Sequence, residues 1–68
     1  MKISARNVLK GTVVSIDKGA TTAHVKIDIG GATVTASITN AAVDELKLEV
    51  GKQAYAVVKA SDVMVAVD

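Results

Sequence analysis

Apolar and polar residues alternate most clearly over residues 22–29 and again over residues 32–39. A period of two is typical of β-strands that pack one face against a core and expose the other. Gly30 and Gly31 separate the two stretches, and both can adopt the positive φ that a two-residue hairpin turn requires. The pattern therefore predicts two antiparallel strands joined by a tight turn.

Three further stretches are predicted to be strands. Residues 7–17 are rich in Val, Ile and Leu, and Gly11 within them predicts a long strand that bends at the glycine. Residues 53–59 predict a fourth strand and residues 63–67 a fifth. Residues 60–62 are expected to form a tight corner between these last two strands.

Asn40 suits the N-cap position of a helix, which predicts one short helix over residues 41–46. The elements together predict an all-β fold, a small five-stranded OB-like barrel with one short helix between strands 3 and 4. A chain of 68 residues has room for one domain, which is expected to span residues 1–68.

The predicted core lacks large side chains. Hydrophobic residues make up 50% of the chain, but Phe and Trp are absent and Tyr55 is the single aromatic residue. Ordering a small chain costs on the order of 1.5 kcal/mol per residue, and small side chains recover little of that cost. The chain contains no Cys for a disulfide, and one histidine cannot build a zinc site. The composition therefore predicts stabilisation by association with further copies of the chain.

The charge balance narrows the possible partners. Eight basic and seven acidic residues give a net charge of +1, which argues against a general binder of polyanions. No apolar run approaches the roughly 18 residues of a membrane span, and the first residues lack the apolar region of a secretory signal. We expect a soluble, cytoplasmic protein.

Two short polar clusters lie near opposite ends of the chain, Ser4-Ala5-Arg6-Asn7 and Lys59-Ala60-Ser61. Each joins a cation to a small hydroxyl, with backbone N–H groups on short side chains beside them. A tetrahedral oxyanion requires this mixture of fixed positive charge, hydroxyl donors and accessible amides. The clusters predict an anion-binding site.

Each residue of the clusters also has a purely structural interpretation. Arg6 could be a solvated side chain at a frayed terminus. Lys59 could simply be exposed at a strand end, and Ser61 could cap a turn. Asp62 would repel an anion and is interpreted as a residue that orders the corner.

Two further anion ligands are candidates. Thr39 ends the third predicted strand just before the helix, where its hydroxyl could join helical N–H groups in binding an anion; the alternative is an ordinary strand threonine. Gly19, Ala20 and Thr21 form a turn with accessible backbone, followed by the hydroxyl of Thr22. They could form a second anion site, or a simple hairpin turn.

The sequence offers no catalytic machinery. His24 lies on a polar strand face and is expected at the surface, and neither Ser15 nor Ser37 has the spacing of an activated nucleophile. The chain contains no glycine-rich phosphate loop and no paired carboxylates in a recognisable context. These features predict a binding protein rather than an enzyme, with no directly ligated metal cation.

The chain resembles the molbindins, or Mop proteins, which are single molybdate-binding domains of the TOBE type. The resemblance covers essentially the whole chain and rests on Ser4-Ala5-Arg6-Asn7, Leu9-Lys10-Gly11, Ile38-Thr39 and the stretch from Val57 to Val63. It implies cytoplasmic hexamers, built as trimers of dimers, that bind and store molybdate or tungstate at subunit interfaces.

The resemblance also implies individual roles. Ser4, Arg6, Lys59 and Ser61 match ligand positions of the family, and Ala60 would contribute its backbone. Thr39 matches a threonine that a neighbouring chain contributes. Where relatives often carry Ser, this chain has Ala42, which removes one hydroxyl from that part of the site. The alternatives are an OB-like nucleic-acid-binding domain, although the chain lacks stacking aromatics and a basic groove, and a purely structural assembly module.

Overall fold

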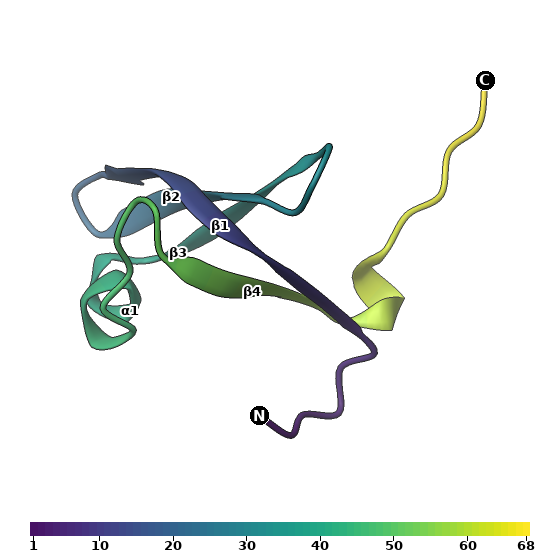
Figure 1. Cartoon of the computed structure of the whole chain (residues 1–68), viewed down its shortest axis with the longest axis horizontal. Helices are drawn as coiled ribbons and strands as arrows, with labels where there is room; N and C mark the ends of the chain where they lie inside the picture. The colour runs from purple at the N-terminus through teal and green to yellow at the C-terminus, as the bar shows by residue number, and fades with distance from the viewer.

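The computed structural model describes all 68 residues and confirms an all-β fold with one short helix. Its elements, in chain order, are β1 (Asn7–Lys18), β2 (Thr22–Asp28), β3 (Thr33–Thr39), α1 (Asn40–Glu45), β4 (Gln53–Val58) and the single 3₁₀ turn η1 (Ala60–Asp62). The four strands pair in the order β3-β2-β1-β4 and curl into a half-barrel (Figure 1). All three strand pairs are antiparallel.

The hairpin between β2 and β3 forms as predicted. Gly30 and Gly31 have φ values of 90° and 83°, in the region that only glycine adopts without cost. The N–H of Ile29 donates to the carbonyl of Ala32 at 2.9 Å and closes the turn. The turn thereby fixes the register of β2 and β3, in which the apolar residues of both strands lie on the same face of the sheet.

The core is as thin as the composition predicts. Only six residues are buried, none of them aromatic: Val13, Ala23, Val25, Ile27, Val43 and Ala56. The buried members of β2 alternate with exposed polar residues, His24 among them. This confirms the inward and outward faces that the period of two predicts.

The irregularity of β1 lies at Val14 rather than at Gly11. The register between β1 and β2 shifts between Val13 and Ser15, so a β-bulge at Val14 bends the strand. Gly11 has a different role, because a Cβ there would overlap the carbonyl oxygen of Asp28 and approach Ile27 Cγ2 to 2.7 Å. The glycine permits close contact between β1 and β2.

Replacing Gly11 by Ala is expected to destabilise the fold by about 3 kcal/mol, at the upper end of the usual cost of overpacking, because the added methyl group meets a rigid backbone carbonyl. Urea unfolding at one fixed protein concentration measures the effect. Lys10→Ala, at the exposed neighbouring position, is the control and should change stability little. If the Gly11→Ala protein were as stable as the parent, β1 and β2 would have to move apart at this position without loss of free energy of unfolding.

The helix begins one residue earlier than predicted. Thr39, not Asn40, is the N-cap, and its Oγ accepts a hydrogen bond from the N–H of Ala42 at 3.0 Å. Asn40 is the first residue of α1, and its Nδ2 donates to the carbonyl of Gly19 at 2.9 Å. Asn and Thr are both good caps, so the contact of Asn40 with the β1–β2 turn decides between them.

The predicted fifth strand over residues 63–67 is absent from the fold of the single chain. No backbone hydrogen bond joins residues 64–68 to the rest of the molecule, and Met64, Val65 and Val67 are 93%, 89% and 92% exposed. After η1 the chain runs away from the half-barrel (Figure 1). A strand exists only when an edge pairs with it, and here the tail does not reach one.

The open side of the half-barrel is an apolar groove. It has a volume of about 580 Å³ and lies between β3 and β4, the two edge strands of the sheet. Its apolar lining includes Val34, Ala36, Ile38, Leu48, Ala54, Ala56 and Val58. The sheet therefore leaves two unpaired edges and an apolar interior uncovered.

The chain exposes more surface than a compact monomer would. Its accessible surface is 5225 Å², whereas about 4,000 Å² is expected at this chain length. The radius of gyration is 12.6 Å, against about 11 Å for a compact domain of this length. None of its helices has the length and apolar character needed to cross a bilayer.

Candidate functional site

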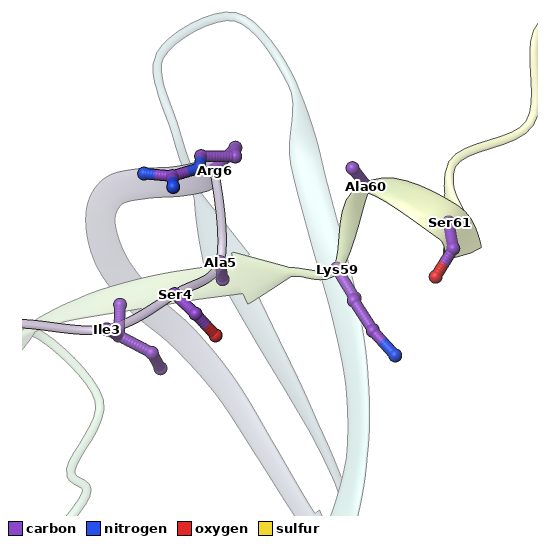
Figure 2. Close-up of a pocket in the computed structure, with 7 residues that line it drawn as sticks. All are labelled: Ile3, Ser4, Ala5, Arg6, Lys59, Ala60 and Ser61. Carbon is purple, nitrogen blue, oxygen red and sulfur yellow. The ribbon is translucent and has the colours of Figure 1, made fainter.

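The two polar clusters meet at one end of the half-barrel. Asn7, the first residue of β1, pairs with Val58, the last residue of β4, and its Nδ2 donates to the carbonyl of Val58 at 3.3 Å. The residues just before β1 and just after β4 are therefore side by side. They line a solvent-open hollow of about 420 Å³, whose residues are Ile3, Ser4, Ala5, Arg6, Lys59, Ala60 and Ser61 (Figure 2).

The hollow contains the six residues of the two clusters for which a ligand role is predicted, together with Ile3. Ile3 supplies an apolar side chain, and nothing in the sequence pattern singled it out. The side chains of Ser4 and Lys59 extend to the same side, and the hydroxyl of Ser61 is directed toward that side as well (Figure 2). The guanidinium of Arg6 points away from Lys59, but the side chain is exposed and therefore free to turn.

None of the four polar side chains is engaged elsewhere in the chain. Ser4, Arg6, Lys59 and Ser61 make no side-chain hydrogen bond, and the single ion pair of the molecule joins Lys18 to Asp44. The turn η1 likewise has no side-chain cap, so the structure does not show Ser61 in the capping role considered above. The hydrogen-bonding capacity of the hollow is available to a ligand.

The hollow is also electrostatically one-sided. Arg6 and Lys59 border it, and no carboxylate is among its lining residues. Asp62, the nearest acidic residue in sequence, is exposed and does not line the hollow. Two cations with hydroxyls and amides beside them can neutralise and hydrogen-bond a dianion.

Thr39 and the second candidate site lie at the other end of the molecule. Thr39 pairs with Thr22 across β2 and β3, and the N–H of Asn40 donates to the carbonyl of Thr21 at 2.9 Å. The β1–β2 turn and the start of α1 are thus packed together, away from the start of β1 and the end of β4 (Figure 1). Thr39 cannot share an anion with the hollow of its own chain.

The turn that carries the second candidate site is held mainly through its backbone. The N–H of Gly19 donates to the carbonyl of Thr22 at 2.8 Å, and the carbonyl of Gly19 accepts from Asn40 Nδ2. Asn40, which sequence reasoning placed only as a cap, fixes this turn against α1. Anion binding by Gly19, Ala20 and Thr21 remains a prediction.

The fold is a half-barrel with a hollow of unengaged donor side chains at one end. Comparison with known proteins identifies its family. The family model described as the TOBE domain matches residues 3–65. A probable molybdenum-pterin-binding protein of Haemophilus influenzae is 62% identical, over 100% of both chains.

Solved structures agree with this match. MopII from Clostridium pasteurianum superimposes with a TM-score of 0.91 at 46% identity, covering 97% of this chain and all of that one. The cytoplasmic molybdate-binding protein ModG, in a form with molybdate bound, gives a TM-score of 0.89 at 45% identity; this chain covers 46% of its length. The chain belongs to the molybdenum-pterin-binding (Mop, or molbindin) family of TOBE domains, which are binding modules and not enzymes.

Proposed function

We propose that this protein binds molybdate or tungstate as an intact tetrahedral oxyanion and stores it in the cytoplasm. The observation that carries the proposal is the hollow at the start of β1, which is lined by four residues with unengaged donor side chains and by no carboxylate. The names of the relatives support it, since ModG is described as cytoplasmic and molybdate-binding and holds molybdate in its structure.

In this proposal the residues of the hollow divide the work by charge and geometry. Arg6 and Lys59 compensate the two negative charges of the anion, and Ser4 and Ser61 donate hydroxyl hydrogens. Ala5 and Ala60 have small side chains that leave their backbone N–H groups accessible. Since no group in the hollow is arranged for acid–base or redox chemistry, the oxyanion leaves in the form in which it enters.

The oxyanion itself, rather than a pterin, is the ligand that the hollow suits. A pterin ring is flat and aromatic, and sites for such rings use stacking side chains. The only aromatic residue, Tyr55, borders the apolar groove and does not line the hollow. We therefore assign the hollow to molybdenum in its oxyanion form.

We further infer that the fifth strand of the OB-like barrel comes from a second copy of the chain. The groove lies between two unpaired strand edges, and the tail from Val63 to Val67 is extended, apolar and exposed. Five extended residues span about 17 Å, which is comparable to β3 and β4. Exchange of tails would cover the groove and reduce the excess exposed surface of the single chain.

The proposed assembly is a hexamer arranged as a trimer of dimers. Tail exchange accounts for a dimer. Thr39 is the N-cap of α1, and α1 lies at the opposite end of the fold from the hollow (Figure 1), so an anion that contacts both must join two chains. A second type of contact of this kind extends dimers into a larger, closed assembly.

Isothermal titration calorimetry with sodium molybdate tests the proposed function, and elemental analysis of the protein as purified complements it. We expect saturable binding of molybdate and of tungstate that survives gel filtration, with a weaker response to sulfate because the smaller anion leaves some donors unpaired. Displacement of molybdate by an equimolar amount of sulfate, or the absence of any molybdate response, would refute the proposal.

Ala42→Ser is expected to tighten molybdate binding a few-fold at sites that include Thr39. The new hydroxyl would lie next to the N-cap, and a net hydrogen bond contributes about 1 kcal/mol. Calorimetry on Ala42→Ser, Thr39→Val and the double variant measures the coupling between the two positions. Purely additive effects would mean that the two hydroxyls do not contact one anion.

A further inference from the structure

We infer that Asn7 is a positioning residue of the hollow, and that its side chain holds the two cation-bearing segments at the separation that fits molybdate. The inference rests on the proposed function and concerns a residue that does not itself contact the anion. Asn7 belongs to the first polar cluster of the sequence, but it does not line the hollow. Its Nδ2 donates instead to the carbonyl of Val58 on β4.

Asn7 is a polar residue on an otherwise apolar face of β1. It shares that face with the fully buried Val13, because side chains alternate along a strand and the two positions are evenly spaced. Asn7 itself is half-buried, and asparagine is among the residues that strands disfavour. Strand stability therefore does not account for an amide at this position.

The carbonyl that Asn7 binds belongs to the peptide unit that leads into Lys59. The carbonyl of Val58 and the N–H of Lys59 lie in one rigid plane, so the hydrogen bond from Asn7 Nδ2, at 3.3 Å, restrains the orientation of Lys59. The next peptide unit is restrained as well, because the carbonyl of Lys59 accepts from the N–H of Asp62 at 2.9 Å. Both peptide units that flank Lys59 are thus held, and Asn7 holds one of them.

No hydrogen bond connects the two segments of the hollow directly. None joins the residues before β1 to the residues after β4. Arg6 directly precedes Asn7, and Lys59 directly follows Val58. The side-chain contact of Asn7 therefore lies at the point from which both cations extend. In the single chain, the separation of the two segments depends on this contact and on the pairing of β1 with β4.

A contact in this place should control selection by size. Molybdate is a larger tetrahedron than sulfate, and donors held at a fixed separation leave the smaller anion with unpaired donors. When the contact is lost, the two segments can adapt to either anion, and the anion that they previously fitted loses most. Removal of the amide should therefore reduce the affinity for molybdate more than the affinity for sulfate.

Asn7→Leu tests the inference, since leucine has nearly the shape of asparagine and carries no donor. Calorimetric titration with sodium molybdate, and competition of sodium sulfate against bound molybdate, give the two affinities, with the assembly state checked by native mass spectrometry. We expect the affinity for molybdate to fall about tenfold, the factor for one hydrogen bond at the upper end of its usual strength, and the ratio of molybdate to sulfate affinity to fall by about threefold or more.

An unchanged ratio in Asn7→Leu would overturn the inference even if both affinities fell, because a general structural defect weakens the binding of both anions alike. Unchanged affinities would overturn it too. If Asn7→Leu did not fold, Asn7→Ser, which shortens the side chain and adds no bulk, carries the same expectation. Failure of the parent protein to bind molybdate would refute the proposed function instead.

Gln53→Leu is the matched control. Gln53 lies at the opposite end of β4 from the hollow, and its amide also makes a side-chain hydrogen bond, from Nε2 to the hydroxyl oxygen of Tyr55 at 3.4 Å. The substitution replaces an amide by an apolar side chain without altering the net charge, so both affinities and their ratio should stay unchanged. A fall in the ratio equal to that of Asn7→Leu would assign the effect to any loss of an amide from β1 or β4, and the inference would be overturned.

Discussion

Lys59→Ala should lower the affinity for molybdate by about 2–5 kcal/mol, the range found when one partner of a close, desolvated charge pair is removed. That range corresponds to a factor of about 30 to 5,000 in Kd. The effect should be large because only Arg6 and Lys59 bring positive charge to the hollow. The loss of either leaves a dianion with one compensating cation.

The control for Lys59→Ala is Lys26→Ala, which removes the same charge from an exposed position on β2. It changes the net charge equally and should leave molybdate affinity nearly unaltered. Calorimetry on both variants, with the assembly state checked by native mass spectrometry, makes the comparison. If both variants lost affinity equally, the effect would belong to overall charge and not to the hollow.

Arg6→Ala is expected to behave like Lys59→Ala, and Arg6→Lys should recover only part of the loss. A guanidinium presents a planar fork of donors, whereas an ammonium is a point charge. The guanidinium of Arg6 points away from Lys59 in the single chain (Figure 2), so anion binding should turn it toward the ligand. Unchanged affinity in Arg6→Ala at equal assembly state would remove this residue from the site.

The double variant Val65→Asp and Val67→Asp should abolish assembly and leave monomers at micromolar concentration. Both side chains are about nine-tenths exposed in the single chain, so charge at these positions costs nothing there. In the proposed exchange of tails, the same two positions share one face of a strand that covers an apolar groove. An unpaired charge buried in such a groove is strongly unfavourable.

Ala66→Asp is the matched control for the tail, because position 66 lies on the opposite face of an extended strand. It should retain the assembly. Native mass spectrometry and sedimentation distinguish the outcomes. A hexamer that persisted in the double variant would show that the tail lies outside the interface, and a folded monomer of the parent protein would contradict the assembly altogether.

Binding and assembly should be thermodynamically linked if the anion joins two chains. A ligand that binds only the assembled state stabilises that state by mass action. This linkage should contribute strongly to stability, because only six residues are buried in the single chain. Much of the stability of the protein would then come from contacts between copies and from the bound oxyanion.

The sequence by itself determined the elements that depend on local chemistry. The period of two over β2 and β3 predicted their buried faces, and the two adjacent glycines predicted the positive φ values of the hairpin. The absence of large aromatic side chains predicted the thin core. Six of the seven residues that line the hollow were also identifiable, because cations, hydroxyls and small side chains cluster in two segments near opposite ends of the chain.

Only the tertiary structure decided features that depend on contacts between distant residues. The hollow forms because Asn7 and Val58, 51 positions apart, meet at the end of β1 and β4. Thr39 rather than Asn40 caps α1 because Asn40 is held by Gly19 across the β1–β2 turn. The tail over residues 63–67 has the composition of a strand, but composition cannot provide the edge that a strand needs. The local sequence pattern determines which secondary structure a segment can adopt. Pairing with distant residues determines whether the segment adopts it, and with which partner strand.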